Sequence, residues 1–323
     1  MKSIGTASAP AKVILFGEHF VVYGNPAILA AINKRVTATA RALDDSRIII
    51  TSDIGAAAEY SGSKFTLLRG GKSARTILDP IHDAVNRCHR ANKMRSGLKL
   101  DLRSEVPYGI GLGSSAASCV AAVAAADSTS GRHGRQWVCE VAVESEKMIH
   151  KNSSGADCYV SAIGGMISYS KKGGFRKLVP KRALSLVVGS TGIRHSTGEL
   201  VASVARFRKR NMVIFRSLAK RAEEISDEAL TAIQLGDVEQ LGRLMNENQL
   251  LLRNIGVTYK TNRLINACIR AGALGAKITG AGGGGAVIAL AATRKESAKI
   301  AARIKASGYE PMEVTVDMKG LVH

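Results

Sequence analysis

The sequence predicts a mixed α+β fold built as two domains. Its 323 residues are enough for two domains of ordinary size. In the first half, strand patterns, in which apolar and polar residues alternate, are mixed with helical patterns. In the second half, a strand pattern is followed by helical stretches and then by further strands. We therefore expect an N-terminal domain over residues 1–181 and a C-terminal domain over residues 182–323, with no change in composition at the boundary near Lys181.

The elements expected in the first half follow from periodicity and from the absence of helix breakers. Leu98, Leu100 and Leu102 alternate with polar residues, which predicts a half-buried strand over 98–106. Residues 115–126 are mostly alanine and valine and contain no Gly or Pro, which predicts a helix. Further elements are expected as strands at 12–16, 36–43, 48–51 and 164–169, a helix at 136–150 and a turn at 171–174.

The second half is expected to begin with a strand at Leu184. Helical patterns follow at 203–225, 238–254 and 259–271, and then come strands at 276–279 and 286–291, a helix at 294–307 and a strand at 313–316. Aromatic residues make up only 4% of the chain, so we expect alanine, valine, leucine and isoleucine to fill the core.

The net charge limits the classes of partner. The chain carries 46 Lys and Arg against 26 Asp and Glu, a formal net charge of +20, which attracts polyanions. The basic residues are spread along the chain, with small clusters at 171–172 and 206–210, and no aromatic RNA-binding signature accompanies them. We therefore expect a solvated basic surface and no specific nucleic-acid site.

No segment predicts export or insertion into a membrane. The apolar run 13–16 is short and is followed at once by Gly17-Glu18-His19. Residues 273–292 contain Lys277 and a run of glycines, which indicates a loop between two strands and not a membrane span. The five cysteines are dispersed without a CxxC pair, so neither a zinc site nor a disulfide is expected. We expect a cytoplasmic protein with reduced, mostly buried thiols and no membrane partner.

A glycine-rich loop between the strand at 98–106 and the helix at 115–126 is the most informative motif. It consists of Pro107, Tyr108, Gly109, Ile110, Gly111, Leu112, Gly113, Ser114, Ser115, Ala116 and Ala117. Glycines let backbone N–H groups approach an anion, and the following helix adds its free amides and the positive end of its dipole. The loop lacks the Gly-Lys-Ser/Thr ending of a Walker A motif. It predicts a phosphate site, or else a connector ahead of a tightly packed helix.

Two further segments carry ionisable residues in unusual positions. Lys12 enters an apolar strand, where its charge is costly unless it meets an anion or the strand lies at an edge and the side chain points to water. Glu146 lies near a helix end, and Asp157 follows a small polar loop. A kinase of small alcohols needs one carboxylate for the hydroxyl proton and another for Mg²⁺. Asp157 also fits a second interpretation, in which Ser154-x-x-Asp157 only caps a helix.

A second glycine run lies between two predicted strands. Residues 280–285 match the G-x-G-x-x-G pattern of dinucleotide-binding proteins. That motif must open a helix, whereas residues 286–291 predict a strand. We therefore expect a turn that approaches either a neighbouring loop or a bound phosphate.

These segments, in this order and at these separations, resemble the three signature motifs of the GHMP kinases, a family of small-molecule kinases. Within it, residues 12–31, with Gly17-Glu18-His19, are most similar to the branch that phosphorylates mevalonate. Residues 192–201 and 246–252 support the resemblance, which covers almost the whole chain and is weakest at 51–97. It implies an N-terminal domain like that of ribosomal protein S5, a ferredoxin-like C-terminal domain, and a cleft between them for ATP and the substrate.

The resemblance also implies roles by position. Asp157 matches the catalytic base and Lys12 its partner, while Ser115 and Glu146 match the ligands of Mg²⁺. Residues 107–117 match the loop that holds the ATP phosphates. The positions near the substrate are matched by Glu18, His19, Thr197 and Gly282. Ser153 departs from the pattern, because many members have proline there, and this loosens the loop that holds Asp157.

The implied reaction is ATP- and Mg²⁺-dependent phosphorylation of the C5 hydroxyl of mevalonate in isoprenoid synthesis, in a chain that is a homodimer in many relatives. Phosphomevalonate kinase or a sugar kinase is the alternative within the family. Galactose is matched less well, because Phe20 and Val21, and no aspartate, follow Gly17-Glu18-His19. A non-catalytic ligand-binding or nucleic-acid-binding protein on the same fold is the alternative outside it.

Overall fold

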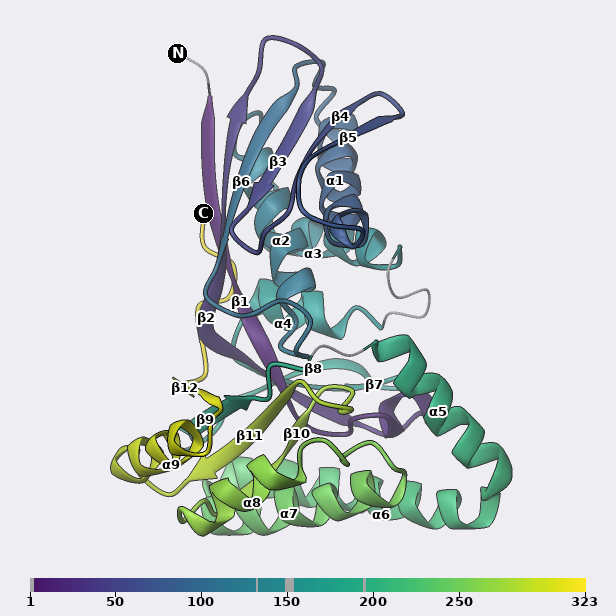
Figure 1. Cartoon of the computed structure of the whole chain (residues 1–323), viewed down its shortest axis with the longest axis vertical. Helices are drawn as coiled ribbons and strands as arrows, with labels where there is room; N and C mark the ends of the chain where they lie inside the picture. The colour runs from purple at the N-terminus through teal and green to yellow at the C-terminus, as the bar shows by residue number, and fades with distance from the viewer. Residues whose placement is uncertain (1–2, 132, 149–153, 194–195) are drawn as a thin grey trace.

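The computed structural model describes residues 3–131, 133–148, 154–193 and 196–323 and has an α+β architecture with two sheets (Figure 1). The strands are β1 (Ile4–Phe16), β2 (Ala27–Ala42), β3 (Ile48–Ser52), β4 (Ala57–Ser61), β5 (Lys64–Arg69), β6 (Leu98–Ser104), β7 (Met166–Ser170), β8 (Gly174–Leu178), β9 (Ser185–Ser190), β10 (Gly275–Thr279), β11 (Ala286–Ala291) and β12 (Glu310–Val314). The helices are α1 (Ala74–Ala91), α2 (Ser114–Asp127), α3 (Arg135–Glu146), α4 (Ala156–Ile163), α5 (Thr197–Arg210), α6 (Met212–Leu235), α7 (Val238–Asn254), α8 (Asn262–Arg270) and α9 (Arg294–Ala306), with a short 3-10 helix η1 (Phe20–Tyr23).

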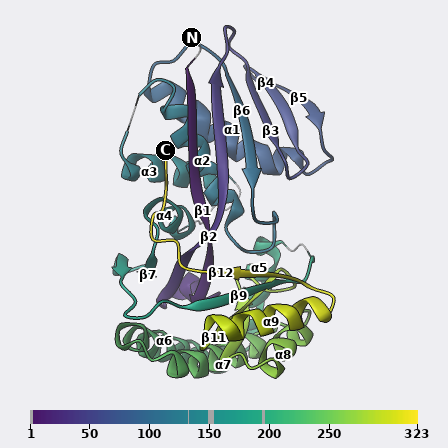
Figure 2. The same cartoon turned by 90° about the vertical axis from the view of Figure 1, so that its left-hand side faces the viewer.

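The N-terminal sheet is organised around its longest strand, β2. The strand order is β5-β4-β3-β6-β2-β7-β8, and β1 pairs with β2 alone. The second half of β2 pairs with β6 and its first residues pair with β7. Helix α2 packs on β1 and β2 and is surrounded on its other sides by α1, α3 and α4 (Figure 2). This position explains why α2 is almost purely alanine, valine and small polar residues, nearly all of them buried.

The C-terminal sheet is antiparallel, with the order β10-β11-β9-β12. Helices α7, α8 and α9 contact its strands, and α6 packs against α7 at the base of the molecule in Figure 1. The edge strand β10 is covered by α7, whose amide side chains replace a neighbouring strand. The Ala276 N–H donates to Asn246 Oδ1 at 3.0 Å, and the Ile278 N–H donates to Gln249 Oε1 at 3.0 Å.

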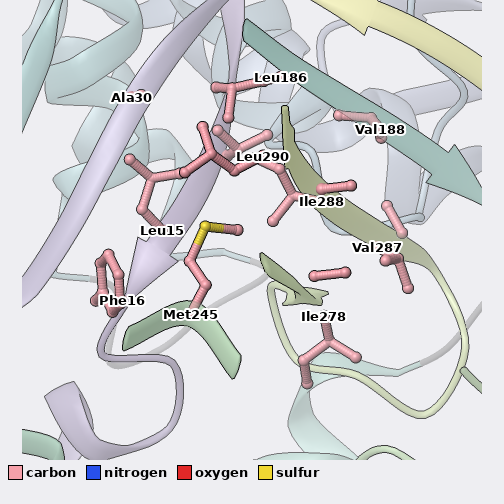
Figure 3. Close-up of a cluster of buried hydrophobic side chains, with 14 of the residues drawn as sticks. Leu15, Phe16, Ala30, Leu186, Val188, Met245, Ile278, Val287, Ile288 and Leu290 are labelled. Atoms are coloured by element: carbon pink, nitrogen blue, oxygen red, sulfur yellow. The ribbon is translucent and has the colours of Figure 1, made fainter. Parts of the chain in front are cut away.

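The core of the C-terminal half also contains the ends of β1 and β2. Leu15 and Phe16 of β1 lie beside Met245 of α7 and close to the apolar side chains of β9 and β11 (Figure 3). Two strands that begin in the N-terminal sheet therefore help to build the core around the second sheet. The boundary near Lys181 stays a prediction.

After β12 the chain returns to the N-terminal sheet and ends beside β1 (Figure 2). Val322 forms a β-bridge with Ser8. Arg35 of β2 fixes this segment, because its Nη2 donates to the carbonyls of Ser8 and Gly320 at 2.7 Å each and its Nη1 pairs with Asp317. The C-terminal segment is thus part of the N-terminal half in space.

Most predicted elements are present, and the differences have physical causes. The helix expected over 203–225 is two helices, because the backbone leaves helical geometry at Asn211, whose side chain donates to the Phe207 carbonyl. Strand β12 occupies 310–314 where 313–316 was expected. Strand β1 starts earlier than expected because its first buried residues are Gly5, Ala7 and Ala9, which give no bulky apolar alternation. The pattern predicts no element over 57–91, where the structure has β4, β5 and α1.

The cysteines are buried, and residues 273–292 contain a loop between two strands, both as predicted. All five cysteines are buried and free. Residues 273–292 contain β10, the glycine turn and β11. In the described part of the chain, no helix has the length and apolar character needed to cross a bilayer.

Candidate active site

Lys12 and Asp157 form an ion pair at the centre of the molecule. Lys12 lies in β1 and is only 4% exposed, so the interpretation as an edge lysine that points to water is wrong. Its Nζ is 3.0 Å from Asp157 Oδ2. Asp157 lies in the first turn of α4, where the helix dipole favours a carboxylate. The cap residue of α4 is Gly155, and the Ala156 N–H donates to Ser154 Oγ at 3.3 Å, so the polar loop before α4 also helps to hold the start of this helix.

The glycine loop before α2 lies directly against Lys12. Gly109, Gly111 and Gly113 all have positive φ values, of 79°, 90° and 69°. The Lys12 N–H donates to the Leu112 carbonyl at 2.9 Å. A Cβ atom at Gly113 would lie 2.7 Å from Lys12 Cγ, so only glycine leaves room for this lysine. The loop therefore brings the N-terminus of α2 next to the Lys12–Asp157 pair.

Ser115 and Glu146 supply oxygen atoms next to this helix terminus. Ser115 lies in the first turn of α2, and its Oγ donates to Glu146 Oε1 at 2.5 Å. Glu146 is the last residue of α3 and is 4% exposed. Burial, together with the nearby Glu146 carboxylate, raises the pKa values of the Cys119 and Cys158 thiols, which makes these thiols poor nucleophiles. Ser115 and Glu146 together thus offer one hydroxyl and one carboxylate.

This donor set fits one cation in particular. Carboxylate and hydroxyl oxygens are hard ligands, and Mg²⁺ is usually held by one or two carboxylates together with substrate phosphates. Among residues outside 149–153 and the other undescribed positions, no cluster of three His, Cys, Asp or Glu side chains could hold a metal. A softer metal with an all-protein shell is therefore not supported by the described residues.

Glu18 and His19 follow β1 and contact the far end of the chain. Glu18 is 1% exposed and pairs with the fully buried Lys277 of β10. His19 Nε2 lies 2.8 Å from the Ala281 carbonyl oxygen, with the His19 backbone at φ 63°. Burial raises the pKa of Glu18, opposed by the nearby charges of Lys277 and Lys12. Burial lowers the pKa of Lys277 for the same reason, the loss of water around a charge.

The Lys277–Glu18 pair was missed at the sequence level. From the sequence, Lys277 indicates only that residues 273–292 do not span a membrane. The signal was nevertheless the same as for Lys12: a lysine in an apolar strand requires an anion. The sequence could not say which carboxylate it meets, since the two residues are 259 positions apart.

The second glycine loop, residues 280–285, touches the first one. A Cβ atom at Gly280 would lie 3.2 Å from both Cα and the carbonyl oxygen of Gly111. Gly282 has φ 76° and packs against the Val257 carbonyl. The turn connects two strands, as predicted, and its neighbour is another loop. The two glycine loops thus form one continuous backbone surface beside α2.

Thr197 is the exposed first residue of α5, whose N-terminal end lies between the two sheets in Figure 1. Its helix is held near the second glycine loop, because the Gly285 N–H donates to the Ile193 carbonyl at 2.9 Å and Gly283 packs against Leu200.

Phe20 is fully buried against Phe215. Ser153 lies outside the described residues.

A separate hollow of about 790 Å³ lies on the outer face of the N-terminal sheet. Thr37, Arg41, Asp101 and Arg103 are among its lining residues. None of the site residues described above lines it. The hollow is therefore distinct from the site around Lys12.

Comparison with known proteins gives consistent matches over the whole chain. Two family models match: "GHMP kinases N terminal domain" over residues 79–165 and "GHMP kinases C terminal" over residues 229–310. The mevalonate kinase of Pyrococcus furiosus is 40% identical, with 98% of this chain and 97% of that protein covered. The mevalonate kinase of Thermococcus gammatolerans is 39% identical over the same shares.

Solved structures show the same architecture. Mevalonate kinase of L. major in complex with R-mevalonate superposes with a TM-score of 0.83 at 30% identity, covering 98% of this chain and 95% of that one. Lactococcus lactis galactokinase complexed with galactose gives a TM-score of 0.77 at 21% identity, covering 99% and 95%, a likeness of fold alone.

Proposed function

This chain belongs to the GHMP kinase family, and from that premise we propose that it transfers the γ-phosphoryl group of ATP to the C5 hydroxyl of (R)-mevalonate. The single observation that carries the proposal is the ion pair between buried Lys12 and Asp157, placed against a glycine loop that opens α2. The acceptor is supported by relatives that are about 40% identical over 98% of the chain and are mevalonate kinases.

Asp157 acts as the base in this proposal. Its side chain is 39% exposed, so the carboxylate can be reached by a substrate, whereas the side chain of Lys12 is 5% exposed. Asp157 accepts the proton of the C5 hydroxyl as the oxygen attacks the γ-phosphorus. The positive charge of Lys12 stabilises the negative charge on the transferred group during the reaction.

The loop over residues 107–117 holds the phosphates. Positive φ values at three glycines turn the backbone so that the α2 N-terminus faces the Lys12 side chain, and the free amides of that terminus donate to phosphate oxygens. Ser115 and Glu146 are the residues that would hold Mg²⁺. When bound, Mg²⁺ neutralises phosphate charge and orients the γ-phosphoryl group.

We place the acceptor beside Glu18 and His19, which follow the end of β1. Glu18 offers a buried carboxylate and His19 a buried imidazole. Thr197 at the start of α5 offers a hydroxyl. Gly282 contributes backbone groups only, since a side chain there would collide with the Val257 carbonyl oxygen.

A substrate panel tests the assignment. ADP release from ATP and Mg²⁺ would be measured with mevalonate, phosphomevalonate, galactose and homoserine as separate acceptors. We expect kcat/KM to be highest for mevalonate. A higher value for another acceptor would replace mevalonate by that acceptor, and turnover with none of the four would remove the assignment as a kinase of this group.

A further inference from the structure

Lys277 occupies a position where a charge is hard to accommodate. It lies in the middle of β10, all five residues of which are buried, and it is itself 0% exposed. Its neighbours Ala276 and Ile278 belong to the hydrophobic core. An ammonium group is retained in such surroundings only where it meets an anion and further acceptors.

The ammonium group of Lys277 contacts both an anion and a further acceptor. Its Nζ donates to Glu18 Oε1 and to the Ile278 carbonyl at 2.8 Å. The other carboxylate oxygen, Glu18 Oε2, is buried and has no hydrogen-bond partner among the described residues. Lys277 thus fixes one oxygen of Glu18 and leaves the second as an unused acceptor. An unpaired acceptor inside a protein is costly, and the carboxylate that carries this one is close enough to Lys12 for the two charges to interact.

The backbone on both sides of Glu18 is fixed as well. Gly17 has φ 90°, and a Cβ atom there would lie 2.4 Å from the Pro26 carbonyl oxygen. His19 has φ 63°, an uncommon conformation for a residue with a side chain. Because the main chain around Glu18 is held in this way, the side-chain contact with Lys277 decides where the carboxylate points.

Two further hydrogen-bond contacts join the same two segments. The Ile14 N–H donates to Thr279 Oγ1 at 2.8 Å, and His19 Nε2 lies 2.8 Å from the Ala281 carbonyl oxygen. The end of β1 is therefore attached to β10 and its turn with or without the ion pair. Holding the two segments together does not by itself require Lys277.

We propose that Lys277 is a positioning residue for the acceptor substrate: it holds Glu18 Oε1 so that Oε2 is presented to a hydroxyl group of mevalonate. It also balances the charge of Glu18, so that a substrate that is itself a carboxylate can approach. This inference rests on the proposed function and deepens it, because it extends the acceptor site to a residue of the other sheet.

Three variants of the full chain test the proposal: Lys277→Met, Glu18→Gln and the double variant. In Lys277→Met we expect kcat/KM for mevalonate to fall by about 10- to 100-fold, with KM for ATP unchanged within about twofold. In the double variant we expect no loss beyond that of Glu18→Gln alone, within about threefold, because Lys277 acts through Glu18. Losses that multiply would overturn the proposal, as would normal mevalonate kinetics in folded Lys277→Met.

The design separates positioning from stability. Lys277→Met leaves a buried carboxylate unpaired and can fail to fold, whereas the double variant removes both charges. If the single variant does not fold, the comparison of the double variant with Glu18→Gln decides alone. Thr279→Val is the matched control, since it removes a neutral contact between the same segments, and its effect should multiply with that of Glu18→Gln.

The pH profile gives a second readout. The charges close to Glu18 are Lys277 of β10 and Lys12 of β1, and the imidazole of His19 adjoins it. Both lysines lower the pKa of Glu18 against the effect of burial, so Lys277→Met should move the acid limb of kcat/KM for mevalonate to higher pH. Wild-type turnover is measured first: if it prefers another acceptor, the proposed function fails, and the Lys277 variants are then tested with that acceptor.

Discussion

Two lysines lie buried inside apolar strands of this molecule. Lys12 and Lys277 are 4% and 0% exposed, and each contacts one carboxylate that comes from a distant part of the chain. The two pairs differ in solvent access, because Asp157 is 39% exposed whereas Glu18 is 1% exposed. An accessible carboxylate can exchange a proton with a substrate, and a buried one is suited to hold a fixed hydrogen bond. Our proposals therefore assign the accessible pair, Lys12–Asp157, to the reaction and the buried pair, Lys277–Glu18, to positioning.

The reacting pair gives the first prediction. Asp157→Asn should lower kcat by about 10²- to 10⁴-fold, because the amide keeps the shape of the side chain but accepts no proton. ATP binding should persist, since the phosphate loop is untouched. Steady-state ADP release and ATP titration measure the two effects. Asp227→Asn, at an exposed position on α6, is the control and should be neutral; near-normal kcat in Asp157→Asn would remove Asp157 as the base.

The second prediction concerns the metal. Glu146→Gln and Ser115→Ala should each raise the Mg²⁺ concentration needed for half-maximal rate, because both remove a hard oxygen donor or its charge. The rate would be measured in a Mg²⁺ titration at saturating ATP and mevalonate. Glu144→Gln on the same helix, where the glutamate is exposed and pairs with Lys147, serves as control. An unchanged Mg²⁺ requirement in both site variants would make the two residues structural.

At the scale of elements, the loops depend on backbone geometry that one added carbon atom can disturb. Gly113→Ala places a methyl group 2.7 Å from Lys12 Cγ at a φ of 69°, so either the loop or the lysine must move. We expect kcat to fall by about 100-fold, as misplacement of a charged group by about 1 Å can cause. Gly134→Ala is the control, because nothing lies within 4 Å of its Cβ position and its φ is −73°. Equal activity of the two variants would contradict the close contact.

Elements with a strong pattern were predictable, and those stabilised mainly by tertiary contacts were not. Helix α7 was expected at 238–254, where the structure has it, because its apolar periodicity is clear. Strand β5 buries almost none of its side chains, so it has no alternation to detect. Helix α1 contains Pro80 in its interior, which hides its periodicity.

The site was predictable to the extent that single residues reveal it. A lysine in an apolar strand, a glycine loop before a helix and carboxylates near helix ends were visible in the sequence. Their partners were not, because contacts such as Lys12–Asp157 and Lys277–Glu18 join positions that only the folded sheets bring together. Resemblance to a family supplied the first pairing, and the physical cost of a buried charge would have demanded a partner for the second.

At the scale of the whole molecule, the C-terminal segment ties the two halves together through Arg35. Its guanidinium pairs with Asp317 and donates to the carbonyls of Ser8 and Gly320, and both charged side chains are largely buried. Arg35→Ala should lower the free energy of unfolding by about 3 kcal/mol, measured by chemical denaturation. Arg41→Ala, on the same strand, removes an exposed pair with Asp101 and should cost less than about 1 kcal/mol. Equal losses of unfolding free energy in Arg35→Ala and Arg41→Ala would show that the contacts of Arg35 with the C-terminal segment contribute little to stability.

The last prediction concerns the net charge of +20, which is a property of the surface as a whole. Because the basic residues are dispersed, binding of an oligonucleotide should be weak and should fall steeply with salt, as release of counterions requires. Phosphoryl transfer should lose far less activity with salt, since in the proposed site ATP is held by directed backbone hydrogen bonds and by charges at short range. A labelled oligonucleotide is titrated at rising salt beside a mevalonate-dependent ADP-release assay. Tight, sequence-selective binding at physiological ionic strength would reveal a nucleic-acid site that the dispersed charge does not predict.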